Sequence, residues 1–374
     1  MLILVRDPNL VPVAEIDVFP ELRWTERLHA VGGWALTATP GAIGPLLDPG
    51  HGITVLDDDG TVVLSGAVGV SSSGLPTFRR TIAEDGSDAI VVSGVDDKAC
   101  LSDRLAWPEP YTAEPPFAVE SHDVRTGIAS TVLLEYIAAN AGPGALVERR
   151  TPNLTMAPDP LVGSVVTGRA RFANLLGLVD QLATMGGVIV SVRQVDRALV
   201  VSVAARQDRS QDVTFSTRFG NVSSADYAAE PLTGTWVIAG GSGEGTARTF
   251  VTTPSPVGRR IEVFNDQRSI SDLAELQASA DAALVEAAGK TSLTFTPIES
   301  DGLRFGRDFR IGDVVSVDID DVRFSDVVAS ADATLNSSGL TRTLTVGRES
   351  TAGALSLVHG IRTLARRVSA LERI

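Results

Sequence analysis

Four prolines lie within nine residues of this chain, and they constrain the fold more than any other local feature. They are Pro108, Pro110, Pro115 and Pro116. Because proline fixes φ and lacks a backbone donor, no regular helix can run through this segment. We therefore expect an extended linker over 108–116, with a domain boundary at this point.

Residues 1–107, before the linker, show a pattern of strands and turns. The run GITVLDDDGTVVLSGAVGV places Asp59-Gly60 between two alternating apolar segments, which is a strong hairpin signal. A further strand, AIVVSGV, precedes a short helix that Asp96 or Asp97 is placed to cap. This part of the chain is predicted to be an N-terminal β domain.

After the linker, residues 117–210 predict a small α+β domain. The sequence STVLLEYIAANAGPG predicts a helix that ends at Asn140 to Gly142. A second helix is predicted within RFANLLGLVDQLATMGG. Its apolar face comprises Phe172, Leu175, Leu176, Val179 and Leu182. The runs VIVSVR and ALVVSVA flank a polar turn around Asp196 and predict a hairpin.

Strand patterns resume over 211–350, which we predict to be a second β domain. The segments TGTWVIAG and ARTFVTT flank the polar run GSGEG and predict another hairpin. A helix is predicted at 271–288, capped by Ser271 and closed by Gly289. The predicted fold class is therefore α+β, mainly β, with an inserted α+β domain and a C-terminal helix.

The C-terminal residues 351–374 carry apolar side chains at alternating spacings of three and four. These are Ala354, Leu357, Ile361, Leu364, Val368 and Leu371. The spacing is that of the a and d positions of a coiled coil, so we expect the chain to meet copies of itself. β-branched residues at a with leucine at d favour a dimer. A terminal helix that packs on its own domain would explain the same stripe.

Charge and composition exclude several classes of function. The net charge is -14 and no basic run is interleaved with aromatics, so sequence-specific nucleic-acid binding is not expected. Cys100 is the only cysteine, which excludes internal disulfides and cysteine-based zinc sites. No stretch approaches the ~20 apolar residues that a membrane helix requires. The N-terminus lacks the features of a signal peptide, so we expect synthesis in the cytoplasm without membrane insertion.

No candidate catalytic site assembles from the sequence. The loop 240–248, GGSGEGTAR, imitates a nucleotide fingerprint, but a strand follows it and the Walker lysine is absent. Cys100 and His122 stand in the order of a Cys/His hydrolase, although nothing else supports that pairing. Carboxylate pairs that a glycosidase could use are also explained by turns, namely Asp308 with Asp313 and Asp318 with Asp320. We predict a non-enzymatic protein with no catalytic, cofactor-binding or metal-binding residues.

The segment 302–319, GLRFGRDFRIGDVVSVDI, is the most specific motif of the chain. Gly306 and Gly312 allow tight turns, while Asp308 and Asp313 are placed to accept hydrogen bonds from local backbone amides. This arrangement resembles a signature of the tail-tip or baseplate hub proteins of long-tailed phages (siphoviruses), of the actinobacteriophage type. Other segments resemble the same family in the same order, namely Trp24 to Trp34, 101–108, 213–227 and 237–248.

The resemblance implies a structural virion protein located at the phage tail tip. Such a hub is a homotrimer whose two β-barrel-like domains form a pseudo-sixfold ring. The ring would join the tail tube or distal tail protein to a tail fibre, spike or other tail-tip protein. It would also leave a channel for the non-specific passage of phage DNA. In a trimer, the terminal helices would meet along a seam formed by Leu357, Ile361, Leu364, Val368 and Leu371.

Two functions from other classes remain as alternatives. One is a tail-associated cell-wall hydrolase. The other is a carbohydrate-binding receptor module that uses tryptophans as stacking platforms. The candidate platforms are Trp24, Trp34, Trp107 and Trp236.

Overall fold

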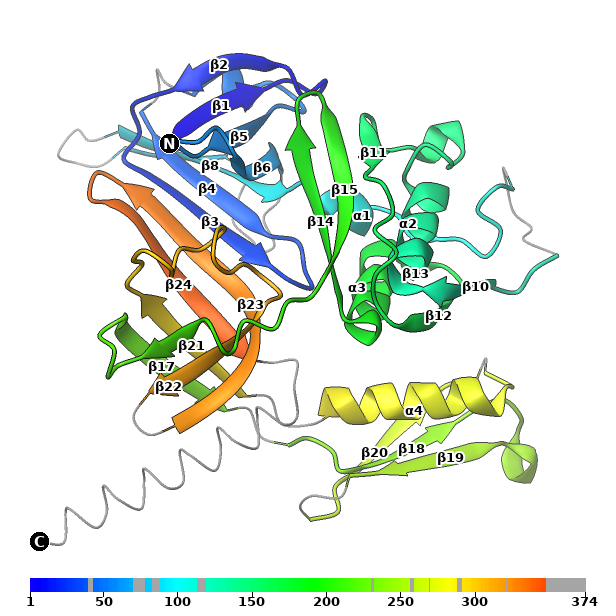
Figure 1. The fold of residues 1–374 in the computed structure, drawn as a ribbon. Helices are drawn as coiled ribbons and strands as arrows, with labels where there is room; N and C mark the ends of the chain where they lie inside the picture. The colour runs from blue at the N-terminus through cyan, green and yellow to red at the C-terminus, as the bar shows by residue number, and fades with distance from the viewer. Residues whose placement is uncertain are drawn as a thin grey trace, which may run out of the picture. The chain divides into compact units, whose positions relative to one another are not determined.

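The structure is a computed structural model of the 374-residue chain (Figure 1). It describes residues 1–39, 43–69, 78–82, 88–112, 119–229, 232–255, 259–268, 270–287, 291–319 and 322–347. The chain divides into two compact units. The first comprises Met1–Asp208, Arg310–Asp313 and Ser330–Leu344, and the second comprises Arg209–Phe309, Val314–Ala329 and Thr345–Ile374.

The first unit begins with an antiparallel sheet. Its strands are β1 (Leu2–Arg6), β2 (Pro12–Ile16), β3 (Glu21–Arg27), β4 (Gly33–Ala38), β5 (Gly52–Leu56), β6 (Val62–Val68), β7 (Phe78–Ile82), β8 (Asp88–Asp96), the second half of β23 (Val322–Asn336) and most of β24 (Gly339–Gly347). A 3-10 helix, Gly44–Leu47, follows β4. The strand order is β24-β23-β3-β4-β8-β6-β5-β1-β2, with β7 also paired to β8. The predicted barrel is not found among the described strands, because β2 pairs with β1 on one side only and the order stays an open path.

Two predicted features of this sheet can be followed to single residues. The hairpin at Asp59-Gly60 is confirmed, because β5 pairs antiparallel with β6 across it. Asp57 fixes the turn, since its Oδ1 accepts hydrogen bonds from the backbone amides of Asp59 (3.0 Å) and Thr61 (2.7 Å). Trp24 and Trp34 lie opposite each other on β3 and β4 and are both 2% exposed. These two tryptophans therefore belong to the core and offer no stacking platform.

The rest of the first unit contains three helices and short sheets. The elements are α1 (Ala99–Ser102), β9 (Leu105–Ala106), β10 (Asp123–Ile128), α2 (Ala129–Asn140), a 3-10 helix (Val147–Arg149), β11 (Leu154–Met156), β12 (Val165–Ala170), β13 (Ala173–Asn174), α3 (Leu175–Gly186), β14 (Val188–Val195) and β15 (Ala198–Ala205). The hairpin β14–β15 around Asp196 is confirmed, and β11 extends it as a parallel edge strand. A core of leucine, valine and isoleucine side chains lies between α2, α3 and these strands.

One prediction for α3 is wrong. Phe172 precedes the helix, has a φ of +59° and is 42% exposed, so it is not on the apolar face. The helix starts at Leu175 because Asn174 caps it, with Oδ1 accepting a hydrogen bond from the amide of Gly177 at 3.1 Å. It ends as predicted, with Gly187 in the left-handed conformation at φ +66°.

The second unit contains the remaining elements. They are β16 (Thr214–Ser216), β17 (Val222–Ala229), β18 (Trp236–Gly240), a 3-10 helix (Gly245–Ala247), β19 (Phe250–Pro254), β20 (Glu262–Asp266), α4 (Leu273–Ala287), β21 (Thr291–Pro297), β22 (Val314–Ile319), the first half of β23 and the end of β24 (Gly339–Gly347). Three aromatic rings form part of its core, with Phe215 centred 4.7 Å from Phe295 and 5.2 Å from Phe309.

A small α/β module, residues 232–287, is inserted between the paired strands β17 and β21. Its sheet has the order β19-β18-β20, and α4 packs against one face (Figure 1). The amides of Thr233 and Gly234 both donate to the carbonyl of Ala287, which closes the module at its base. The predicted cap of α4 is wrong by one residue. Asp272, not Ser271, accepts the hydrogen bond from the amide of Glu275 (2.9 Å).

The predicted seam, 351–374, lies outside the described residues, as do Gly289 and Asp320. Among the residues that are described, no helix combines the length and the apolar character that a membrane crossing requires.

Candidate functional site

The first half of the predicted hub motif forms a tight turn in the second unit. Gly306 has a φ of +88°, a conformation that glycine adopts without strain. Asp308 Oδ2 accepts a hydrogen bond from the amide of Arg304 at 2.8 Å. Hydrogen bonds from the Arg307 side chain and from this amide hold the pKa of Asp308 below its usual value. A carboxylate engaged in this way is suited to holding a turn.

The second half of the motif lies in the first unit. Gly312 has a φ of +90°, and a Cβ at this position would lie 2.6 Å from Cγ1 of Ile189. Asp313 is buried, and its Oδ2 accepts a hydrogen bond from the amide of Arg310 at 3.1 Å. The geometry of both halves is that of local turns, and neither half places a carboxylate in a described cleft.

The candidate enzyme residues are held in other arrangements. Burial raises the pKa of the Cys100 thiol to about 12, which opposes formation of the nucleophilic thiolate. His122 is half-buried, and its Nδ1 lies 3.2 Å from Oγ of its neighbour Ser121. Asp318 forms an ion pair with Arg323 at 2.5 Å. In the described part of the chain, no group of three or more His, Cys, Asp or Glu side chains is arranged to hold a metal ion.

The glycine-rich loop 240–248 is the tip of the predicted hairpin, which is confirmed as β18 paired antiparallel with β19. Its last glycine, Gly245, begins only a three-residue 3-10 helix, Gly245–Ala247. Arg248 folds back over the loop, where its Nε and Nη2 donate to the carbonyls of Gly241 (3.0 Å) and Gly240 (2.8 Å). The loop carbonyls are thus used internally, and no long helix N-terminus is present to receive a phosphate.

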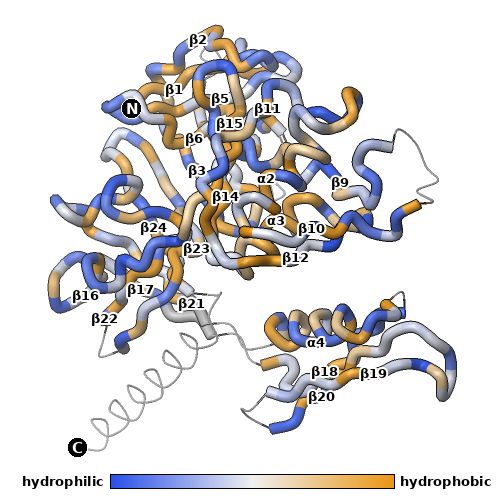
Figure 2. The backbone as a smooth tube through the Cα atoms, turned by 45° about the vertical axis from the view of Figure 1, so that its right-hand side comes forward, coloured by the Kyte–Doolittle hydropathy of each residue, from blue (hydrophilic) through white to orange (hydrophobic). Residues whose placement is uncertain are grey.

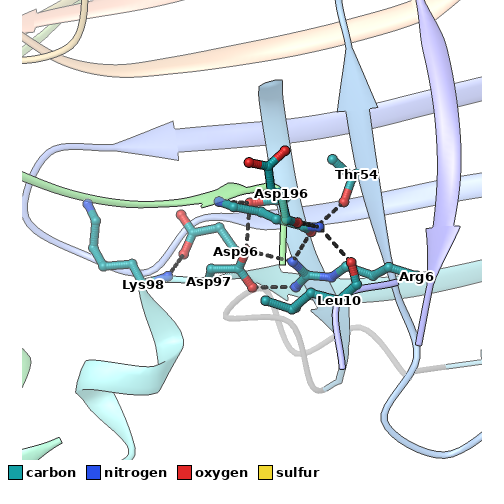
Figure 3. A network of polar contacts seen from close by, with 9 residues as sticks. Arg6, Leu10, Thr54, Asp96, Asp97, Lys98 and Asp196 are labelled. Atoms are coloured by element: carbon teal, nitrogen blue, oxygen red, sulfur yellow. Dashed lines mark hydrogen bonds and ion pairs between the residues drawn. The ribbon is translucent and has the colours of Figure 1, made fainter. Parts of the chain in front are cut away.

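A buried polar network that the sequence did not predict joins three strands of the first unit to the hairpin β14–β15 (Figure 3). Arg6, at the end of β1, forms an ion pair with Asp97, and both side chains are 4% exposed. Asp97 also accepts a hydrogen bond from Ser65 Oγ at 2.5 Å. Gln194 Oε1 accepts from Arg6 Nη1 and from Thr54 Oγ1, each at 2.7 Å.

The same glutamine completes the network on the hairpin side. Its Nε2 donates to the carbonyls of Leu10 (3.0 Å) and Asp196 (2.8 Å). Its backbone amide donates to Ser65 Oγ at 3.2 Å. Every polar atom of the Gln194 side chain therefore has a partner, as a buried amide requires. The only sequence signal for this network is a charged residue, Arg6, at the end of the apolar run MLILV.

A second buried group fastens the turn between β3 and β4. Lys98 Nζ donates to the carbonyls of Arg27 (2.7 Å) and Leu28 (3.2 Å). Asp96 Oδ2 accepts from the amide of Gly32 at 2.9 Å. Burial lowers the pKa of Lys98 and raises that of Asp96. Both groups are engaged with backbone atoms, so their role in the fold is structural.

Comparisons of this chain with known proteins find similarity to tail proteins of phages and prophages. The family described as Siphovirus ReqiPepy6 Gp37-like protein matches residues 2–348. No curated protein matches the chain. A 43 kDa tail protein of prophage MuSo2 from Shewanella oneidensis has a similar structure, with a TM-score of 0.59 and 15% identity, over 93% of this chain and 99% of that one.

Two further crystal structures have similar folds. A tail protein from Neisseria meningitidis MC58 gives a TM-score of 0.56 at 15% identity, over 95% of this chain and 98% of its own. Prophage tail protein gp18 from Listeria monocytogenes EGD-e gives a TM-score of 0.51 at 12% identity, over 98% of this chain and 100% of its own. The similarity to these three tail proteins therefore extends over 93–98% of this chain.

Proposed function

The chain belongs to the Siphovirus ReqiPepy6 Gp37-like family, and on that basis we propose that it is the hub of a phage tail tip or baseplate. The observation that carries the proposal is the family match over residues 2–348, supported by the fold similarity to three tail proteins along nearly their whole lengths. In this role the protein is a non-enzymatic trimer. It joins the tail tube or distal tail protein to a fibre, spike or other host-recognition part.

The hub would surround the path of the phage DNA. Its net charge of -14 suits this role, because an acidic surface repels DNA phosphates and so does not gain binding free energy by releasing the counterions of the DNA. In this proposal the β domains 1–107 and 211–350 form the ring, and the linker 108–116 leads into the α+β domain 117–210 between them in sequence. The last helix would lie on the threefold axis below the ring.

The terminal seam supplies the first test of the trimer. We expect light scattering to give the mass of three chains for the full protein, and a smaller mass for a version that ends at Ser350. Replacement of both Ile361 and Leu364 by asparagine should lower the measured mass as the truncation does, because it places polar amides at the apolar a and d positions. Thr363→Asn, at an outward c position, is the matched control. A strictly monomeric full chain would contradict the trimer.

Location in the particle is a separate test. Antibodies raised against the purified protein should label the tail tip of intact virions in electron micrographs, and should not label the tube or the head. Label elsewhere, or none on virions that contain the protein, would refute the hub role. Turnover of purified host cell wall that is lost in Asp308→Ala would instead support a hydrolase.

A further inference from the structure

The inserted module 232–287 covers only one face of its sheet. On the inner face, Val237 and Ala239 of β18 pack against Leu276 and Ala280 of α4, and all four are buried. Alternate residues of β19 and β20 point the other way and are exposed. The open face is therefore a flat sheet surface with no helix over it among the described residues.

The open face is aromatic and rigidly built. Phe250 and Phe264 are 50% and 54% exposed, and each ring centroid lies 5.4 Å from the guanidinium of Arg248. Arg248 lies over Gly240 on the central strand, where a Cβ would come within 2.7 Å of Nη2. The bonds from Arg248 to the Gly240 and Gly241 carbonyls hold it in place. Exposed aromatics around a fixed arginine have the composition of an interface hot spot.

Positive charge prevails on this face. Arg260 stacks on Trp236 with its guanidinium 3.9 Å from the ring centroid, and it pairs with Glu262 at 2.6 Å. Arg248 and Arg268 both pair with Asp266. Three arginines thus share two carboxylates, in a chain whose net charge is -14. The natural partner of such a face is apolar and acidic.

The outer surface of α4 has that composition. The helix contains no lysine or arginine, and Figure 2 shows its mixed hydropathy. Its exposed apolar side chains are Leu273, Ala274, Ala278, Ala282 and Val285. The carboxylates beside them are Asp272, Glu275 and Glu286, whereas Asp281 faces β19 and accepts hydrogen bonds from Thr253 and Gln277. Small alanines allow a close approach to a flat sheet, and the carboxylates lie where arginines could pair with them.

We propose that α4 of one copy of this chain packs on the aromatic and arginine-rich face of the module in the next copy. This inference rests on the proposed trimer and adds a contact separate from the terminal seam. The two surfaces are on opposite sides of the module, so the contact is heterologous and propagates around a ring. Pairing of two sheet faces would instead bring like charges together.

Engineered cysteines give the direct test. Thr252 is exposed on the open face, and Ala278 is exposed on the outer side of α4. Cys100 gives little background, because burial raises the pKa of its thiol to about 12. Under mild oxidation we expect the full chain with T252C and A278C together to form covalent dimers and trimers. An equimolar mixture of the two single variants should form dimers, and each single variant alone should stay monomeric in denaturing gels.

A matched pair of substitutions tests the specificity of the cross-link. Phe264→Ala in the double-cysteine chain should slow cross-linking at least tenfold, because it removes part of the aromatic surface. Ile298→Ala is the control, since Ile298 is a large side chain 48% exposed outside the module. It should leave the rate unchanged, and circular dichroism should show both variants folded.

The outcomes separate this inference from the proposed function. A trimer by light scattering with no cross-link between positions 252 and 278 would overturn the module contact and leave the hub intact. Cross-linking of T252C with itself would overturn it in favour of a face-to-face contact. A monomer that never cross-links would overturn both proposals.

Discussion

Removal of the Asp97 carboxylate should be among the most damaging single changes in the first unit. The carboxylate accepts hydrogen bonds from both terminal nitrogens of Arg6 and from Ser65 Oγ. Asp97→Ala leaves a buried guanidinium without a counterion. Loss of one partner from a buried pair costs about 3–5 kcal/mol. At about 2–4 °C per kcal/mol for units of 150–250 residues, the expected loss in Tm is about 6–20 °C.

Two further variants test whether the loss of stability comes from the unpaired buried charge. Arg6→Met combined with Asp97→Leu removes both charges and fills the space, so it should recover much of the loss. Asp88→Ala is the control, because Asp88 pairs with Arg80 at the surface, where solvent screens such a pair and it contributes little to stability.

Urea unfolding followed by tryptophan fluorescence suits this comparison, because Trp24 and Trp34 are buried in the core of the same unit. The reasoning predicts a coupling between the two sites, so that the double variant loses much less stability than the sum of the losses in Arg6→Met alone and Asp97→Leu alone. An Asp97→Ala protein within about 0.5 kcal/mol of the parent, by the scale of ordinary surface changes, would refute it. So would a double variant whose two losses simply add.

Three more predictions concern other sites. Gly312→Ala should lower the free energy of unfolding in urea more than Gly306→Ala does, because both glycines have a positive φ but only Gly312 has Ile189 in the space of a Cβ. The backbone strain alone should cost about 1–3 kcal/mol. Equal losses in the two variants would contradict this prediction. Cys100 should react with a thiol reagent at pH 8 only after denaturation, because burial raises its pKa to about 12, and fast reaction of the native protein would disprove the assigned burial. Burial raises the folded-state pKa of Asp96 above 3.8, so the protein should lose stability as pH rises through that raised pKa. Urea titrations should show that this loss is absent in Asp96→Asn.

Local turn chemistry explains most of what the sequence could predict. The hairpins at Asp59-Gly60, around Asp196 and across GSGEG each depend on residues within a few positions of one another. The errors at Phe172 and Ser271 arose because apolar periodicity and cap preference compete within one helical turn. In each case the helix begins where a backbone amide donates a hydrogen bond to the side-chain oxygen of the cap residue three positions before it.

Long-range polar pairing could not be predicted in the same way. Arg6 and Asp97 are 91 positions apart, and Gln194 is 188 positions from Arg6. Their meeting depends on strand register across several pairs of strands, which no local pattern encodes. The exposed Phe250 and Phe264 were missed for another reason. Alternation alone predicts that one face of a strand is apolar, but not which face a helix covers.

The energetics of the buried network argue that its role is to fix position. A buried ion pair loses the hydration of both ions, so an apolar pair of similar volume often gives equal or greater stability. Gln194 is held by the side chains of Arg6 and Thr54 and by the carbonyls of Leu10 and Asp196, which fixes the position of the hairpin β14–β15 against the first sheet. Apolar side chains would fill the same space in more than one register. In the proposed trimer, each copy would need its surface elements in one orientation, so positional specificity is a sufficient reason to retain the network.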